Sequence, residues 1–310
     1  MYDLIIIGGG PAGVSAGIYA ARKKIKFLLI TESFGGQSAV ASEIQNWVGT
    51  KSISGFDLAK KMEDHLMSQE GVEVEEGSPV EKVEKEKGGF KIILKNGKEF
   101  EARTILAASG GRRRRLGIPS EKEFENKGVA YCSTCDAPLF AKKTVAIVGG
   151  GNAALGAVKD LTAYADKVYL MVRGESIKGD PVLFEEIKKD KKAEILFNAE
   201  ITEIFGDASS GGFVSGVKYS DKKSGKIKEL KLEGIFVEIG SVPNSEFLGG
   251  LVNKDGYGDV IVDHGSQKTS HTGIWAAGDI TNLPYRQNII SASDGVKAVL
   301  SISDHLKTGK

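Results

Sequence analysis

Cysteine is nearly absent from this chain of 310 residues, which contains only Cys132 and Cys135. Two cysteines so close together exclude a framework of structural disulfides. A zinc site would need two further soft ligands. The histidines are few and isolated from one another: His65, His264, His271 and His305. We therefore expect no metal site.

Long apolar runs and an excess of charge are also missing. No run approaches the length of a transmembrane helix, and residues 1–3 lead directly into an apolar segment that predicts a buried strand. We therefore expect no signal peptide, no membrane partner and a cytoplasmic location. The 42 Lys and Arg nearly balance the 41 Asp and Glu. A net charge so close to zero gives no long-range attraction for nucleic acid.

A glycine-rich fingerprint follows the apolar run at residues 4–7. Gly8 would make the tight turn from strand to helix, Gly10 would let a pyrophosphate approach the backbone, and Gly13 would let the helix pack closely on the strand. The next strand ends near Glu32, where a carboxylate can accept a hydrogen bond from a ribose. A glycine-rich turn alone needs no ligand, but this order of elements predicts a dinucleotide site.

A second fingerprint repeats the pattern after the apolar run at residues 145–148. Its residues are Gly149, Gly150, Gly151, Asn152, Ala153 and Ala154. We expect a helix from here to about Tyr164 and a strand over residues 168–172. Two such units indicate two bound dinucleotides, or one dinucleotide and a unit that serves only as scaffold. Arg173 stands where an acid would favour NADH, so its positive charge favours NADPH.

The order of elements predicts an α/β fold with two Rossmann-like dinucleotide-binding domains, because alternating strands and helices build parallel sheets. The chain is also longer than one core usually supports. Glycine- and proline-containing segments at residues 117–119 and 240–244 are the predicted crossovers. The first domain would comprise residues 1–116 and 244–310, with the second, residues 117–243, inserted in it.

The two cysteines lie between the fingerprints and are followed at once by Asp136. Thiols three positions apart can close a disulfide across one helical turn, and a dinucleotide site on either side offers an electron donor. This arrangement predicts a flavin-dependent disulfide reductase.

These motifs together resemble the low-molecular-weight thioredoxin reductases, and similarly the flavoprotein subunit of alkyl hydroperoxide reductase without its N-terminal part. The resemblance extends over essentially the whole chain. It implies an FAD held by Gly8, Gly10, Pro11, Ala12, Gly13, Glu32, Gly36, Gln37, Asn46, Ser109, Gly110, Gly278, Asp279, Arg286, Gln287 and Ala292. It implies an NADPH held by Gly149, Gly151, Asn152, Ala153, Ala154, Arg173 and Lys178.

The resemblance also implies roles for the residues of the CxxC segment. Cys135 would face the flavin, and Cys132 would attack the disulfide of thioredoxin or a thioredoxin-like protein, in a homodimeric enzyme. Asp136 is the candidate acid that protonates the leaving thiolate. A carboxylate at a helix start can instead cap backbone amides, and both roles can coexist.

Departures from the family pattern leave alternatives open. Residues 154–158, with Gly156 among them, stand where the family usually has a pair of glutamates, and Arg173, Gly174 and Lys178 preserve two of the three usual positive charges. NADPH remains the favoured donor, with ferredoxin or another donor as the alternative. A non-catalytic, redox-sensing flavoprotein is a further possibility. The four arginines at residues 112–115 predict a solvated turn, or else a contact with an acidic thioredoxin surface or a phosphate.

Overall fold

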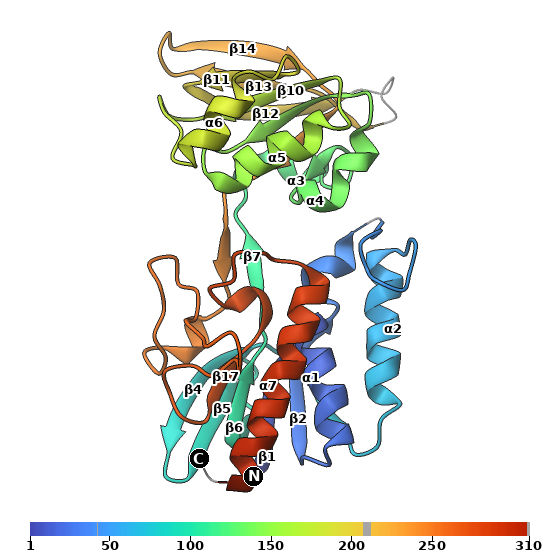
Figure 1. Cartoon of the computed structure of the whole chain (residues 1–310), viewed down its shortest axis with the longest axis vertical. Helices are drawn as coiled ribbons and strands as arrows, with labels where there is room; N and C mark the ends of the chain where they lie inside the picture. Colours follow the sequence, from blue (N-terminus) through green and yellow to red (C-terminus); the bar gives the residue numbers. More distant parts are fainter. Residues whose placement is uncertain (42, 207–211, 309–310) are drawn as a thin grey trace. The chain divides into compact units, whose positions relative to one another are not determined.

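The computed structural model describes residues 1–41, 43–206 and 212–308. The chain divides into two compact units, the first comprising Met1–Arg112 and Val242–Lys310 and the second Arg113–Ser241. The second unit thus interrupts the first in the sequence (Figure 1). These limits lie a few residues from the predicted boundaries. That each unit binds its assigned nucleotide remains a prediction.

The first unit is built on a mostly parallel sheet. Its central strand β1 pairs in parallel with β2 and β6, while β4, β5 and β6 form antiparallel pairs. The last residues of β6 pair in parallel with β17. The strands are β1 (Tyr2–Gly9), β2 (Phe27–Phe34), β3 (Glu73–Glu76), β4 (Val80–Glu86), β5 (Gly89–Leu94), β6 (Glu99–Ala107) and β17 (Ile274–Ala276).

Both faces of this sheet are buried, which explains the continuous apolar run in β1. Leu4 and Ile6 belong to the core formed with the helices α1 (Pro11–Arg22), α2 (Gly55–Met67) and α7 (Asn288–Thr308). Ile5 and Ile7 point to the other face, into a core with β5 and the segment around residues 247–262. Helices α1 and α7 lie side by side along the sheet (Figure 1).

The second unit contains a five-stranded parallel sheet in the order β11-β10-β9-β15-β8 and a three-stranded antiparallel sheet. The parallel strands are β8 (Val129–Ala130), β9 (Thr144–Val148), β10 (Lys167–Val172), β11 (Ala193–Phe197) and β15 (Gly234–Val237). The antiparallel strands are β12 (Ala199–Gly206), β13 (Val214–Asp221) and β14 (Lys226–Lys231). The helices are α3 (Pro119–Glu123), α4 (Ser133–Asp136), α5 (Asn152–Thr162) and α6 (Pro181–Ile187).

Two short paired strands, β7 (Gly111–Arg113) and β16 (Ser241–Pro243), connect the units. The return crossover lies where it was predicted, but the first was placed too late, at residues 117–119. The first crossover lies earlier because Arg112 and Arg113 of the arginine-rich segment belong to β7, whose backbone pairs with β16. Short 3₁₀ helices complete the fold: η1 (Gly36–Val40), η2 (Ala137–Phe140), η4 (Glu246–Leu248) and η5 (Gly278–Ile280).

The α/β fold class is therefore confirmed, with small corrections to the elements. The strand β6 is continuous over Glu99–Ala107, although its sequence alternates between polar and apolar residues only up to Arg103 and is apolar over residues 105–107. The helix predicted to reach about Tyr164 is α5, which ends at Thr162. Tertiary pairing extends a strand through residues whose local pattern shows a break.

Two glycine-to-alanine substitutions should have opposite effects on stability. A Cβ atom on Gly295 of α7 would collide with the backbone carbonyl of Ala12, whereas one on Gly156 of α5 would have no described atom within 4 Å. We expect Gly295→Ala to lower the free energy of unfolding by about 1–3 kcal/mol. Gly156→Ala should raise it by about 0.5–1 kcal/mol, because alanine loses less backbone entropy in a helix. Urea denaturation measures both, and equal changes would contradict this packing.

Candidate active site

A cavity of about 670 Å³ opens in the first unit, where β1, β2 and β6 end. Its lining includes residues 8–12 of the first fingerprint, Glu32 and Ser33 in the last part of β2, residues 35–38, and residues 109–112 after β6. The carboxyl ends of neighbouring parallel strands are where α/β folds bind dinucleotides. The cavity therefore lies where the first fingerprint predicts a nucleotide.

The fingerprint loop has the geometry that a pyrophosphate needs. Gly8 has a φ of 123°, and a Cβ atom there would overlap the carbonyl group of Ala108. A Cβ atom on Gly13 would overlap the carbonyl of Gly8, so helix and strand are in close contact. Gly10 is the N-cap of α1 and Pro11 its first residue. The amide groups of the first turn are then available to an anion.

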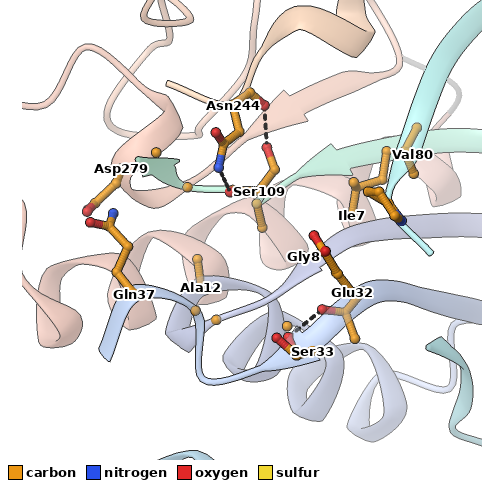
Figure 2. Close-up of a pocket in the computed structure, with 18 of the residues that line it drawn as sticks. Ile7, Gly8, Ala12, Glu32, Ser33, Gln37, Val80, Ser109, Asn244 and Asp279 are labelled. Atoms are coloured by element: carbon orange, nitrogen blue, oxygen red, sulfur yellow. Dashed lines mark hydrogen bonds between the residues drawn. The ribbon is translucent and has the colours of Figure 1, made fainter. Parts of the chain in front are cut away.

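The floor and the polar lining of the cavity are compatible with a bound FAD. The Cα atom of Gly10 lies 3.5 Å from an ideal Cβ atom placed on Gly36, so side chains at either glycine would fill the floor of the cavity. Figure 2 shows the side chains of Gln37 and Asp279 pointing toward one another, with Glu32 elsewhere in the same cavity. These three side chains offer hydrogen-bond donors and acceptors around a floor that consists of glycines. Such a cradle suits a dinucleotide.

Ten of the sixteen residues predicted to hold FAD line this cavity. They are Gly8, Gly10, Pro11, Ala12, Glu32, Gly36, Gln37, Ser109, Gly110 and Asp279. The other six, Gly13, Asn46, Gly278, Arg286, Gln287 and Ala292, are not among its lining residues.

Most of these six residues contact other parts of the first unit. A Cβ on Gly278 would lie near Ala12. The Asn46 amide Nδ2 donates to Gln287 Oε1 at 3.0 Å. Both carboxylate oxygens of the buried Asp259 accept from Arg286, at 2.8 and 2.9 Å. Ala292 is buried in α7.

Asn244 also lines the cavity, although it was not among the predicted cofactor-binding residues. Ser109 Oγ donates to the Asn244 carbonyl oxygen at 2.8 Å, and Asn244 Nδ2 donates to the Ser109 carbonyl oxygen at 3.0 Å (Figure 2). Arg112 binds Asn244 Oδ1 and the carboxylate of Glu246. Its position directly after β16 was the one hint of this role in the sequence, because no motif includes Asn244. Arg112 and Arg115 are exposed, as the prediction of a solvated run requires, but Arg112 lies in β7 rather than in a turn, and Arg115 pairs with Glu125.

The second fingerprint lies between β9 and α5 in the second unit. Gly149 has a φ of 153°, and a Cβ there would overlap the carbonyl of Glu238. Gly151 caps α5, Asn152 begins it, and the buried Ala154 packs beneath Gly149. The fingerprint residues Gly149, Gly151, Asn152, Ala153 and Ala154 are thus brought together at the end of β9. The following loop returns to them, since the Lys178 amide donates to the Gly150 carbonyl at 2.7 Å.

Arg173 lies beside a carboxylate. Its Nη1 is 3.9 Å from Glu200 Oε1, and its side chain is 76% exposed. Glu200 also pairs with Lys222 at 3.0 Å. Lys178 is exposed on the loop after β10. The positive charge predicted to meet a 2′-phosphate is therefore partly offset by Glu200.

The two cysteines form a disulfide, with Cα atoms 5.3 Å apart. Cys132 is the N-cap of α4 and is half-buried, whereas Cys135 is exposed. The two residues between them are held from α5: Ser133 Oγ donates to Asp160 Oδ2 at 2.8 Å, and Thr134 Oγ1 to the same oxygen at 3.3 Å. The predicted pairing of the cysteines is confirmed.

Known proteins share this arrangement. Residues 2–297 match the pyridine nucleotide-disulphide oxidoreductases. The chain belongs to this family. It is an oxidoreductase of a family that uses FAD and a pyridine nucleotide.

Solved thioredoxin reductases have the same fold over their whole length. Those from Streptococcus pyogenes and Giardia duodenalis are each 31% identical to this oxidoreductase, with TM-scores of 0.90 and 0.91, and each comparison covers 99% of both chains. Among sequence relatives, a Bacillus subtilis protein named NADH dehydrogenase is 40% identical over 306 residues, and an Escherichia coli protein named as part of alkyl hydroperoxide reductase is 38% identical over 307 residues. Both comparisons cover 98% of this oxidoreductase but only 58% of the relative.

The described part of this oxidoreductase contains no helix long and apolar enough to cross a membrane. Within residues 1–41, 43–206 and 212–308, no three His, Cys, Asp or Glu side chains gather as metal ligands would.

Asp136 of the oxidoreductase is suited to proton transfer. Burial raises the pKa of its carboxyl to about 6, although nearby Arg113 favours the charged form. A carboxyl that titrates near neutral pH can both donate and accept a proton. Among the described residues Asp136 makes no side-chain capping hydrogen bond at the start of η2. The capping alternative is therefore wrong, and the acid role remains a prediction.

Glu238 is a second carboxyl beside the disulfide that the sequence analysis missed. It follows β15, is 9% exposed, and its Oε1 accepts a hydrogen bond from the Ser133 amide at 3.3 Å. Burial raises its pKa to about 7, with Arg113 and the Ser133 amide acting in the opposite direction. Its only sequence signal was a carboxylate directly after an apolar strand.

Glu238→Gln should change the pH dependence of stability. Because the folded-state pKa of this acid is raised, the native state binds its proton more tightly, and Glu238 lowers stability as pH rises from about 4.5 to about 7. The stability of the variant relative to wild type should therefore be greater at pH 8 than at pH 5, by about 2 kcal/mol. Urea unfolding followed by circular dichroism measures this difference. The same value at both pH values would show that Glu238 does not titrate there.

Proposed function

We propose that this oxidoreductase passes electrons from a pyridine nucleotide through FAD to the Cys132–Cys135 disulfide, and from there to the disulfide of thioredoxin or a thioredoxin-like protein. The observation that carries the proposal is the CxxC disulfide at the surface of a unit with a nucleotide fingerprint, in a chain whose other unit has a cavity of about 670 Å³ lined by the first fingerprint. The likeness to thioredoxin reductases over their whole length supports it.

The chain's own residues would orient the cofactors and move protons. When bound, FAD supplies a two-electron carrier between a nicotinamide and a disulfide. The Gly8 to Ala12 loop and the first turn of α1 would hold its pyrophosphate, and Glu32 its ribose. Reduction of the Cys132–Cys135 bond requires two electrons and two protons. Asp136 would donate one of these protons to the departing thiolate.

The reduced pair would then reduce its partner by thiol–disulfide exchange. One thiolate attacks the partner's disulfide, which forms a mixed disulfide and releases a partner thiolate; the second cysteine then attacks the mixed disulfide and releases the other. The resemblance assigns the attack to Cys132. In this structure Cys135 is the more exposed cysteine, so solvent access alone favours the reverse order. Single-cysteine variants separate these assignments.

The relatives named after alkyl hydroperoxide reductase favour a second candidate partner. They share 38% identity with 98% of this chain and extend well beyond it. We therefore propose, as an alternative recipient, a thioredoxin-like domain that serves a peroxide-reducing protein. A homodimeric, cytoplasmic enzyme is proposed from the family resemblance.

Substitution of the cysteines should stop electrons at the flavin. We expect Cys135→Ser to bind FAD and accept electrons from the donor, but to lose disulfide reduction, because no disulfide can form. Cys132→Ser should lose turnover as well and should place a thiolate against the flavin, which a long-wavelength charge-transfer band would reveal. Anaerobic absorbance spectroscopy and a thioredoxin reduction assay measure these results.

Three outcomes would contradict the proposal. Protein that is colourless and takes up no added FAD would exclude the flavin. Full turnover in either cysteine variant would exclude the disulfide as electron relay. A wild-type flavin that is reduced by a donor but never passes electrons to any disulfide would favour a redox-sensing protein.

The donor is proposed to be NADPH, with NADH as second candidate because Glu200 offsets Arg173 and one relative is named NADH dehydrogenase. We expect Arg173→Ala to lower kcat/KM for NADPH about tenfold, since a charge-assisted contact contributes about 1.5 kcal/mol. NADH should be unaffected. Glu200→Gln should raise kcat/KM for NADPH, because it removes the competing carboxylate.

Lys222→Ala is the matched control, because it removes a charge that Glu200 also binds at 3.0 Å. A wild type that prefers NADH, with both nucleotides unchanged by Arg173→Ala, would exclude the phosphate site. Flavin reduction by reduced ferredoxin and by neither nucleotide would make the second fingerprint a scaffold.

A further inference from the structure

Carboxylates from two elements hold the turn of the redox disulfide. The Ser133 amide, which belongs to the peptide bond after Cys132, donates to Glu238 at 3.3 Å. The hydroxyls of Ser133 and Thr134 both donate to Asp160 of α5. The amide of Ser133 and the hydroxyls of Ser133 and Thr134 therefore donate to carboxylates instead of to backbone carbonyls or water. All of these groups belong to the second unit.

The carboxylate of Glu238 is the more buried of these two. Glu238 is 9% exposed and Ser133 is 7% exposed, whereas Asp160 is half-buried. The charged groups that face Glu238 are Arg113 of β7, Asp136 of α4 and Asp160 of α5. Two of the three are negative, so Arg113 offsets only part of the local charge. An ionised Glu238 therefore adds negative charge in a poorly solvated position beside Cys132.

Such a charge has a definite effect on a thiol. A nearby negative charge and the loss of a hydrogen-bond donor both disfavour a thiolate. The Ser133 N–H is the amide group next to Cys132, and Glu238 already binds it. A reduced Cys132 thus faces a like charge and has one fewer donor for its sulfur.

We propose that Glu238 is a positioning residue of the redox disulfide, whose carboxylate binds the Ser133 amide and keeps the reduced Cys132 as a thiol in the absence of a partner. This inference rests on the proposed function, because Cys132 is a free thiol only if the disulfide is reduced and reoxidised during turnover. Holding the thiol form suppresses exchange with unspecific disulfides, since the thiolate is the attacking species. A docked partner would then have to supply the change that ionises the thiol.

The test measures alkylation of the reduced protein by iodoacetamide as a function of pH, with mass spectrometry assigning the product to each cysteine. Glu238→Gln keeps an oxygen for the Ser133 amide but removes the charge. We expect the midpoint pH for Cys132 to fall by about one unit, so alkylation well below the midpoint becomes about tenfold faster.

Glu233→Gln is the matched control. Glu233 is another carboxylate of the second unit that accepts a backbone hydrogen bond, from the Thr144 amide at 3.1 Å, and it is exposed. Its substitution should leave the alkylation profile unchanged. If the glutamine variant does not fold, Glu238→Met removes the charge with a side chain of similar length, and the same downward shift is expected.

An unchanged or raised midpoint in a folded Glu238 variant would overturn the inference, as would an equal shift in Glu233→Gln. The assay needs only chemically reduced protein, without donor or thioredoxin, so it is independent of turnover. A wild type that reduces no disulfide, combined with the expected shift in Glu238→Gln, would overturn the proposed function and leave the charge effect on Cys132 standing.

Discussion

Close backbone approach at two glycines is the constraint on which the rest of this structure depends. Gly8 lies against the carbonyl of Ala108, and Gly149 against the carbonyl of Glu238, in each case with no room for a Cβ atom. Both glycines also have positive φ values, a conformation that other residues adopt only with strain. Each contact lets a helix begin directly over the end of its strand. The loops at the proposed nucleotide sites and the neighbouring strand ends follow from this geometry.

In the second unit the same contact links the nucleotide fingerprint to the redox centre. Gly149 packs on the backbone of Glu238, and the side chain of Glu238 binds the Ser133 amide. The end of β15 is therefore shared by two functional elements. A substitution at Glu238 would therefore touch both the fingerprint backbone and the disulfide turn.

Charge around the disulfide is predominantly negative, although the chain as a whole is nearly neutral. Asp136, Asp160 and Glu238 gather there, and Arg113 is the counter-charge that acts on Asp136 and Glu238. Burial raises the pKa of both Asp136 and Glu238 toward neutrality. These two carboxyl groups could therefore donate protons to the cysteines when the disulfide is reduced, without a histidine. In the proposed function, FAD and a pyridine nucleotide would carry the electrons, and these carboxyls would supply protons and affect the thiol groups.

Much of the fold and of the candidate site could be predicted from the sequence, because glycine spacing and apolar runs are local signals. The fingerprints at Gly8 and Gly149, the CxxC and the inserted domain all follow from residues that are adjacent in the chain. Ten of the FAD residues that the family resemblance implies line one cavity. The placement of Arg286 against Asp259 was beyond such reasoning, since an arginine's partner depends on a segment far away in the sequence.

The sequence by itself thus determined which functional groups are present: two glycine-rich loops, a pair of cysteines and an adjacent acid. Only the tertiary structure decided the electrostatics of that chemistry. Glu238 meets Ser133 across 105 residues of sequence, and Asp160 meets it across 27. Asn244 reaches Ser109 across 135 residues. Long-range contacts of this kind arise from strand order and burial, which no local pattern encodes, and they determine which charges a thiol or a cofactor meets.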